Sequence, residues 1–184
     1  MTLQEIKHQF YTYRNGALAD SMRRLGAPYK IIFGLNLPQL SAIAREVGKD
    51  AELSQQLWEN KSTRESLLLA PMIYPGEMMD KPTALRWVTE IPSTEVSDIL
   101  CMKLLRDLPF ADELADELML SDNPMTRYTA LRILFNLLGT RENNVRIAET
   151  KGYAESELAL SSPVTLPIAT SILSEINYLL NPET

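Results

Sequence analysis

The sequence predicts an all-α protein, built as a right-handed α-α superhelix (solenoid) of helical hairpins. Strand signals are nearly absent, and the short segment 29–35 (YKIIFGL) is the only plausible strand. Amphipathic helical stretches separated by stop signals fill the rest of the chain. Three of these stretches recur at a regular interval. The 184 residues are enough for one domain with a real core, so we expect a single domain over residues 1–184.

Start and stop signals delimit the predicted helices. Thr2 with Glu5 has the spacing of a capping box, and so has Ser62 with Glu65. Gly26 ends the second helix. After a first helix that opens at Thr2, the predicted helices cover residues 15–26, 38–48, 51–60, 62–74, 81–91, 93–107, 110–120 and 124–138, with two more near 142–154 and 163–180.

A repeat supports the prediction of stacked hairpins. Thr63, Thr94 and Thr126 each lie near the start of a helix that follows another helix, at intervals of 31 and 32 residues. Such intervals are typical of helical-hairpin arrays. One hairpin cannot bury its apolar face alone, so neighbouring hairpins stack. About ten short helices fit such an array better than they fit a four-helix bundle.

The residues that follow the three threonines are Arg64, Glu95 and Arg127, with alternating charge. Stacked repeats would bring these positions together, which predicts a ladder with Glu95 between the two arginines. Asp122, in the turn before Arg127, is also placed to reach it. Arginine suits this role because its guanidinium can serve two carboxylates at once. The alternative is that Arg127 binds a ligand at the surface.

The charge of the chain limits its partners. The net charge is −6, which argues against tight nonspecific binding of nucleic acid. The distribution is uneven, however, because residues 1–50 hold seven Lys or Arg against four acids. A basic surface at the N-terminal end is therefore compatible with the sequence.

The chemistry available to the chain is also limited. Cys101 is the one cysteine and His8 the one histidine, so neither an internal disulfide nor a His-rich metal site is expected. We identify no phosphate-binding glycine loop or nucleophile motif, and we expect no cofactor and no metal. No apolar run approaches the length of a membrane span, and the polar N-terminus is unlike a secretory signal. We expect a cytoplasmic protein without membrane contact.

Two stretches carry a resemblance to a known family. Residues 114–138 resemble a HEAT-type repeat, with a turn aspartate and a following arginine. Residues 22–48 and 53–70 resemble the DNA alkylation repair family, the AlkD-like HEAT-repeat DNA glycosylases, over roughly residues 10–140. The matching features are the turn Phe33-Gly34-Leu35, the helix start at Pro38, the pair Leu57-Trp58, and Glu65.

The resemblance implies an active surface. In that family a concave helical face holds damaged DNA, and active members act as N-glycosylases that release cationic alkylated bases. An aspartate stabilises the developing positive charge, and Asp98 fits its position, with Thr94 standing where the family has an aromatic residue. Arg127 fits the arginine that holds phosphate. The further basic residues expected on DNA are Arg23, Arg24, Lys30 and Arg45.

Alternatives to these assignments stay open at this point. Asp98 lies on its helix near Cys101 and Leu105, away from the predicted core stripe, and an early aspartate also simply favours the helix dipole. The whole protein is compatible with three functions: binding of damaged DNA with or without base release, a silent scaffold for a protein partner, or binding of branched DNA without chemistry.

Overall fold

The computed structural model describes residues 1–138 and 146–181, and in these residues the chain is helical. Residues 29–35, the only plausible strand in the sequence, form no strand, since the described residues make only an isolated parallel bridge between Ile31 and Thr63. Ile31 donates its N–H to the Ser62 carbonyl at 2.8 Å, and its own carbonyl accepts from the Arg64 N–H at 3.1 Å. This short apolar segment therefore packs across the start of a helix instead of joining a sheet.

The chain divides into two compact units, Met1–Met79 and Asp80–Thr184. The first contains α1 (Leu3–Thr12), α2 (Gly16–Arg24), α3 (Leu37–Val47), α4 (Ala51–Glu59), α5 (Arg64–Ile73) and the 3-10 turn η1 (Gly76–Met78). The second contains α6 (Lys81–Thr89), α7 (Thr94–Lys103), the 3-10 turn η2 (Leu105–Asp107), α8 (Ala111–Met119), α9 (Pro124–Leu137), α10 (Ile147–Leu160) and α11 (Leu166–Leu180). The expectation of one domain stays a prediction.

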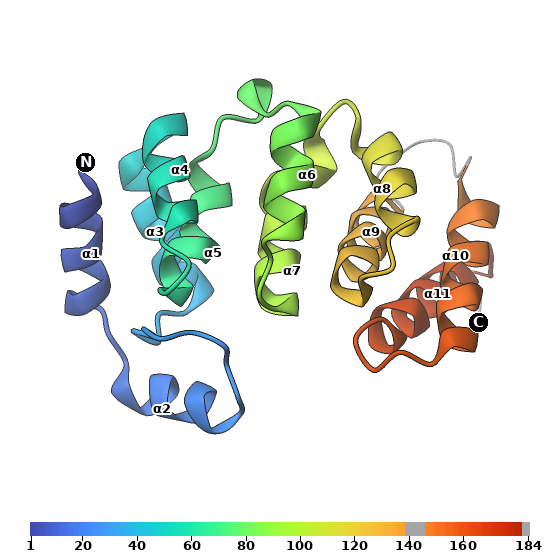
Figure 1. Ribbon diagram of the computed structural model, residues 1–184, viewed down its shortest axis with the longest axis horizontal. Coiled ribbons are helices and arrows are strands. Elements are labelled where there is room, and N and C mark those ends of the chain that lie inside the picture. The colour runs from blue at the N-terminus through green and yellow to red at the C-terminus, as the bar shows by residue number, and fades with distance from the viewer. Residues whose placement is uncertain (139–145, 182–184) are drawn as a thin grey trace. The chain divides into compact units, whose positions relative to one another are not determined.

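The first unit consists of two hairpins with an inserted helix (Figure 1). α4 packs on α5, α3 packs on α5, and α1 packs on α4. α1 also contacts α3 through Gln9, which donates to Glu46 at 3.0 Å, and α2 lies between α1 and α3 in the chain. The capping box of Thr2 and Glu5 is formed at the start of α1. The largest buried side chains of this unit include Phe10, Leu40, Leu57, Trp58 and Leu67.

The second predicted capping box is wrong. Thr63, and not Ser62, is the N-cap of α5, and it makes no side-chain hydrogen bond to the helix. Glu65 is fully buried and reaches away from its own helix. Its carboxylate accepts from the backbone N–H groups of the turn Phe33-Gly34-Leu35, at 3.1, 2.9 and 3.3 Å respectively. Glu65 and the turn at residues 33–35, two features that carry the resemblance to the family, are therefore bonded to each other.

The same turn depends on Gly34 and Arg64. Gly34 has φ +80°, and a Cβ built on it would lie 2.3 Å from the Asn15 carbonyl oxygen, so only glycine fits. Arg64 donates to Glu65 at 2.9 Å and to the Leu35 carbonyl at 3.0 Å. A buried carboxylate is stable here because an arginine and three N–H groups surround it.

The second unit consists of three hairpins, α6–α7, α8–α9 and α10–α11 (Figure 1). The second helices of the hairpins lie in a row, since α7 contacts α9 and α9 contacts α11. Between the last two hairpins, the core contains Tyr128, Leu131, Ala154, Ile168, Ala169, Ile172 and Ile176. Among the described residues, no helix has both the length and the hydropathy that crossing a bilayer requires.

The second helices begin close to the predicted positions, at Leu37, Arg64, Thr94, Pro124 and Leu166. The helix predicted near 142–154 is found as α10, which starts at Ile147; residues 142–145 lie outside the described part. On α9 the side chains of Tyr128, Leu131 and Leu134 are buried, and Thr129 is buried as well. The reason is that α6, α7, α8, α10 and α11 all pack against α9.

Candidate functional site

Asp98 lies at the rim of the seam between α7 and α9. Ser93 caps α7, accepting from the Val96 N–H, and Asp98 follows in the second turn. Cys101, which sequence analysis placed near Asp98 on a free face, is fully buried, and so is Leu105. That face of α7 is covered by α9 and η2. The Asp98 side chain nevertheless keeps 32% of its surface exposed.

Two residues of α9 contact the Asp98 carboxylate. The Tyr128 hydroxyl donates to Oδ1 at 2.8 Å. Nε of Arg132 lies 2.9 Å from the same oxygen. Tyr128 and Arg132 are four residues apart on one helix, so they lie on one face of α9. Among the described residues Nε of Arg132 has no hydrogen-bond partner of good geometry, so this contact is an ion pair and not a directed hydrogen bond.

The surroundings of Asp98 shift the pKa of its carboxylate in opposing directions. Burial raises the pKa of Asp98, while the Tyr128 hydrogen bond and the Arg132 charge work against that increase. Burial and the hydrogen bond to Asp98 raise the pKa of Tyr128 far above its ordinary value. The phenol therefore remains a proton donor to Asp98 across the neutral range. The site is an aspartate and an arginine side by side, both partly exposed.

Polar contacts beneath the pair join the two helices. The hydroxyls of Ser97 and Thr129 lie 2.9 Å apart, and both residues are fully buried. The Cys101 thiol donates to the Thr129 carbonyl at 3.6 Å. Burial raises the pKa of Cys101 strongly, so the thiol stays neutral and is no nucleophile. These contacts fix α7 against α9 and hold Asp98 and Arg132 at a defined distance.

Arg127 has a different place from the one predicted. Its Nε donates to Glu157 of α10 at 2.6 Å, and its Nη1 donates to the Ser121 carbonyl at 2.8 Å. These partners replace Glu95 and Asp122, which sequence analysis expected. Only 13% of the Arg127 side chain is exposed. Its guanidinium therefore binds groups of the protein itself, and a phosphate contact of Arg127 stays a prediction.

Arg132 is the residue that sequence analysis missed. It was not among the predicted site residues, and it forms the ion pair with Asp98. The spacing offered a signal, because Arg132 follows Tyr128 by four residues and the two side chains therefore lie side by side on one helix. The remaining step of the predicted ladder, Arg64 with Glu95, would pair residues of different units and stays a prediction.

The other predicted DNA contacts all lie in the first unit. Arg23 is partly used by the fold, donating to Asp20 at 2.8 Å and to the Ile32 carbonyl at 3.2 Å. Arg24, Lys30 and Arg45 are exposed, and none makes an ion pair with another described residue. These three remain available for phosphate.

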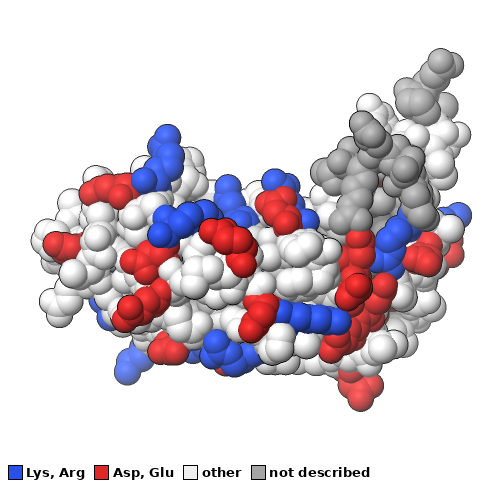
Figure 2. Space-filling model, turned by 90° about the horizontal axis from the view of Figure 1, so that it is seen from above, with Lys and Arg blue, Asp and Glu red and all other residues white. Residues whose placement is uncertain are grey.

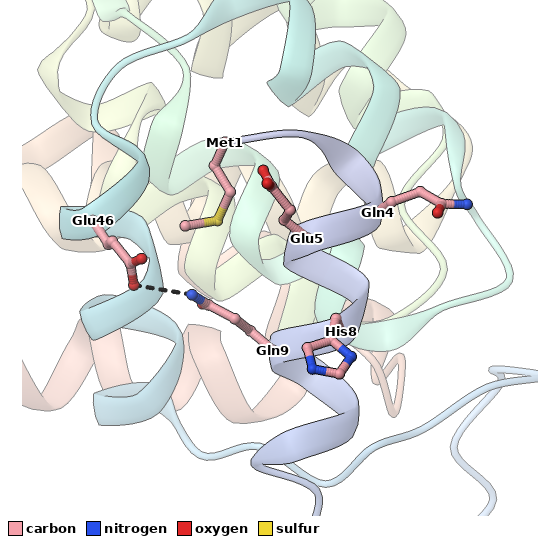
Figure 3. Close-up of a pocket in the computed structure, with 6 residues that line it drawn as sticks. All are labelled: Met1, Gln4, Glu5, His8, Gln9 and Glu46. Atoms are coloured by element: carbon pink, nitrogen blue, oxygen red, sulfur yellow. Dashed lines mark hydrogen bonds between the residues drawn. The ribbon is translucent and has the colours of Figure 1, made fainter.

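A hollow in the first unit has the wrong charge for DNA. It encloses about 730 Å³ between α1 and α3 and is lined by Met1, Gln4, Glu5, His8, Gln9 and Glu46 (Figure 3). Glu46 accepts from Gln9 at 3.0 Å, and Glu5 completes the cap of α1. Two carboxylates in its wall disfavour a phosphate there. In the described part of the chain, His, Cys, Asp and Glu side chains form no group of three that would hold a metal ion.

The two units have the fold of a protein built from HEAT-like helical hairpins. The chain matches a solved structure with a TM-score of 0.87 at 16% sequence identity, over 100% of this chain and 80% of the other. That structure is described as "A new family of proteins related to the HEAT-like repeat DNA glycosylases with affinity for branched DNA structures". At this identity the likeness shows the fold, and it confirms the all-α class of HEAT-like hairpins.

The family follows from the sequence. Residues 6–159 match the family described as "DNA alkylation repair enzyme", which is most of the chain. The protein therefore belongs to the DNA alkylation repair enzyme family, as its motifs predicted. No curated protein matches it significantly.

Proposed function

We propose that the protein binds DNA in repair and that the Asp98–Arg132 pair faces the damaged nucleotide. The observation that supports this is the pair itself: a carboxylate and a guanidinium, 2.9 Å apart, with 32% and 27% of their side chains exposed. Arg132 is suited to a phosphate of the backbone, because a guanidinium binds phosphate through a fork of N–H groups. Asp98 beside it supplies negative potential to a positive centre.

The chemistry that suits such a pair is release of a cationic alkylated base. When the C1′–N bond breaks, its electron pair leaves with the base, which departs neutral. The sugar becomes a short-lived oxocarbenium ion, which water then attacks with loss of a proton to solvent. Asp98, held by Tyr128 and Arg132, stabilises the positive charge that develops on the sugar. Because the base is already a good leaving group, no further acid is required.

A second function, binding of branched DNA without chemistry, is favoured by one residue. Thr94 opens α7 at the position where the family places an aromatic side chain, four residues before Asp98. A threonine offers no flat surface on which a nucleotide can stack. The structural relative is described as having affinity for branched DNA, and that property is a reasonable alternative for this chain.

The decisive experiment measures base release from a duplex that carries one N7-methylguanine. The wild type is compared with Asp98→Asn and with Asp107→Asn, whose carboxylate is exposed on η2. We expect release by the wild type and by Asp107→Asn, and none above background by Asp98→Asn. Release that is indifferent to Asp98→Asn would remove Asp98 from the mechanism.

Binding of the same duplexes separates the remaining functions. DNA binding without any release by the wild type would favour the silent binder. If neither intact, alkylated nor branched DNA binds at low salt, the proposal fails, and a scaffold for a protein partner replaces it.

A further inference from the structure

The segment around α2 is basic in a protein that is acidic overall. Residues 11–31 contain Arg14, Arg23, Arg24 and Lys30 against the single acid Asp20, whereas the whole chain has a net charge of −6. α2 itself is mostly exposed and buries only Ala19. A local excess of positive charge on an acidic protein marks a surface that suits a polyanion.

An apolar side chain projects from the end of this basic helix. Leu25 is the C-cap of α2, and 85% of its surface is exposed. It lies directly after Arg23 and Arg24. Full burial of a leucine in a complex is favourable by itself, so an exposed leucine among cations can add an apolar contact to an electrostatic one.

The backbone holds this leucine in place. Gly26 has φ +84° and donates its N–H to the Arg23 carbonyl at 3.0 Å, and Ala27 donates to the Met22 carbonyl at 3.1 Å. This arrangement closes the helix in the manner of a glycine C-cap. Arg23 also donates to the Ile32 carbonyl at 3.2 Å, which ties the helix end to the segment that follows. The exposure of Leu25 therefore belongs to an ordered helix end.

A second leucine shows that exposure alone carries no meaning. Leu120 is the C-cap of α8 and is 86% exposed, almost the same as Leu25. Its helix carries four acids, Asp112, Glu113, Asp116 and Glu117, and no base. Acidic side chains gather over the region of α8 in Figure 2. Isolated exposed leucines are common, and what distinguishes Leu25 is the charge around it.

We infer that the end of α2, formed by Arg23, Arg24, Leu25 and Lys30 and here called the α2 tip, binds DNA at a branch point. Arg24 and Lys30 contact phosphates, since both are exposed and make no ion pair with another described residue. Leu25 inserts between bases at the junction. This inference rests on the DNA binding proposed above and adds the contact that selects a branch.

The preference for a branch has a physical reason. An apolar wedge in an intact duplex must first unstack a base step, which opposes its insertion. At a three-way junction the steps that flank the branch are already poorly stacked, so the same wedge finds an open apolar surface. Leu25 therefore adds affinity at a junction and little on a linear duplex.

The test compares two matched substitutions, Leu25→Ala and Leu120→Ala, on a three-way junction and on a linear duplex of the same arm sequence. Fluorescence anisotropy at fixed salt reports the affinity. We expect Leu25→Ala to weaken junction binding about tenfold, because about one buried leucine contact is lost. Linear-duplex binding should change by less than about twofold, and Leu120→Ala should change neither.

A base analogue gives an independent readout. 2-Aminopurine at the branch point becomes brighter when it loses the partial stacking that remains there, so the wild type should raise its fluorescence and Leu25→Ala should not. The double variant Arg24→Gln, Lys30→Gln should weaken binding to both DNAs and lower the salt dependence by about 0.9 per lost phosphate contact.

The outcomes distinguish this inference from the proposed function. If the wild type binds DNA but Leu25→Ala matches it on the junction, the α2 tip is not a branch-reading element and the Asp98–Arg132 proposal stands. If the wild type binds no DNA, both fail. Weaker junction binding with unchanged 2-aminopurine fluorescence would overturn insertion of Leu25 between bases.

Discussion

Arg127 of α9 and Glu157 of α10 form an ion pair of 2.6 Å, with 13% and 2% of their side chains exposed. Glu157 also accepts from the Thr165 hydroxyl at 2.7 Å, at the start of α11. One carboxylate therefore links the last two hairpins of the second unit. This explains why an arginine occurs on the apolar side of α9: its charge is neutralised by the next hairpin.

Loss of Glu157 should destabilise the protein strongly. Glu157→Ala leaves the mostly buried Arg127 charge without its carboxylate, and breaking a buried pair from one side costs about 3–5 kcal/mol. The control is Glu155→Ala on the same helix, where an exposed pair with Lys151 is lost and the cost should stay below about 1 kcal/mol. Urea denaturation measures both, and equal midpoints for the two variants would contradict a structural role for the pair.

Tyr128→Phe should raise the pKa of Asp98. The variant removes a hydrogen bond that favours the ionised carboxylate, while burial continues to oppose ionisation. Carbon-13 NMR of the Asp98 carboxyl group measures this pKa, which is already above its ordinary value of 3.8 in the wild type. An unchanged or lower pKa in Tyr128→Phe would show that the hydroxyl does not stabilise the carboxylate.

Base release should depend on pH through the same group. Asp98 must be ionised to stabilise a cation, so release should fall as the pH drops through its pKa, and earlier in Tyr128→Phe. Stability should respond in the opposite direction. The folded state, with the higher pKa, binds more protons, so the contribution of Asp98 grows as the pH falls through the folded pKa and is complete below 3.8. Release that is flat across this range would exclude Asp98 as the charged group.

Arg132→Gln and Arg127→Gln should separate a DNA contact from a structural one. Arg132→Gln should weaken DNA binding and reduce the salt slope by about 0.9, the value for one phosphate. Arg127→Gln should lower the stability while leaving the DNA affinity of the folded protein unchanged, because Arg127 is occupied by Glu157 and Ser121. Titrations of DNA with each variant at several salt concentrations measure the affinity and its salt dependence. A loss of DNA affinity in Arg127→Gln but not in Arg132→Gln would indicate that Arg127 is the residue that binds phosphate.

Gly34→Ala should destabilise the first unit more than Gly48→Ala. Both glycines have positive φ, +80° and +76°, so both alanines suffer backbone strain of about 1–3 kcal/mol. At Gly48 the new Cβ meets open space, whereas at Gly34 it lies 2.3 Å from the Asn15 oxygen. The destabilisation by Gly34→Ala therefore also includes displacement of the turn from Glu65. Thermal or urea unfolding of the two variants measures the difference, and equal losses would argue against close packing of the turn.

Much of the helical pattern was predictable because its signals are local. Capping at Thr2, the glycine stop at Gly26 and the apolar periodicity act within a few residues. The interval between Thr63, Thr94 and Thr126 predicted stacked hairpins for the same reason, since each repeat has a similar start. The motifs around Gly34 and Glu65 predicted the family, although the structure shows that these two residues support the fold.

The pairing of charges was decided by tertiary structure alone. A sequence reports that Arg127 and Arg132 lie on one helix, but not that α10 offers Glu157 to the first and α7 offers Asp98 to the second. The predicted ladder assumed that equivalent positions of successive repeats meet. Arg127 instead pairs with Glu157 on α10, which is the first helix of the next hairpin. The choice depends on which helices pack around α9, and five of them do. Local signals determine where helices begin and end, while the partner of a long charged side chain is set by the packing of distant segments, which no local pattern encodes.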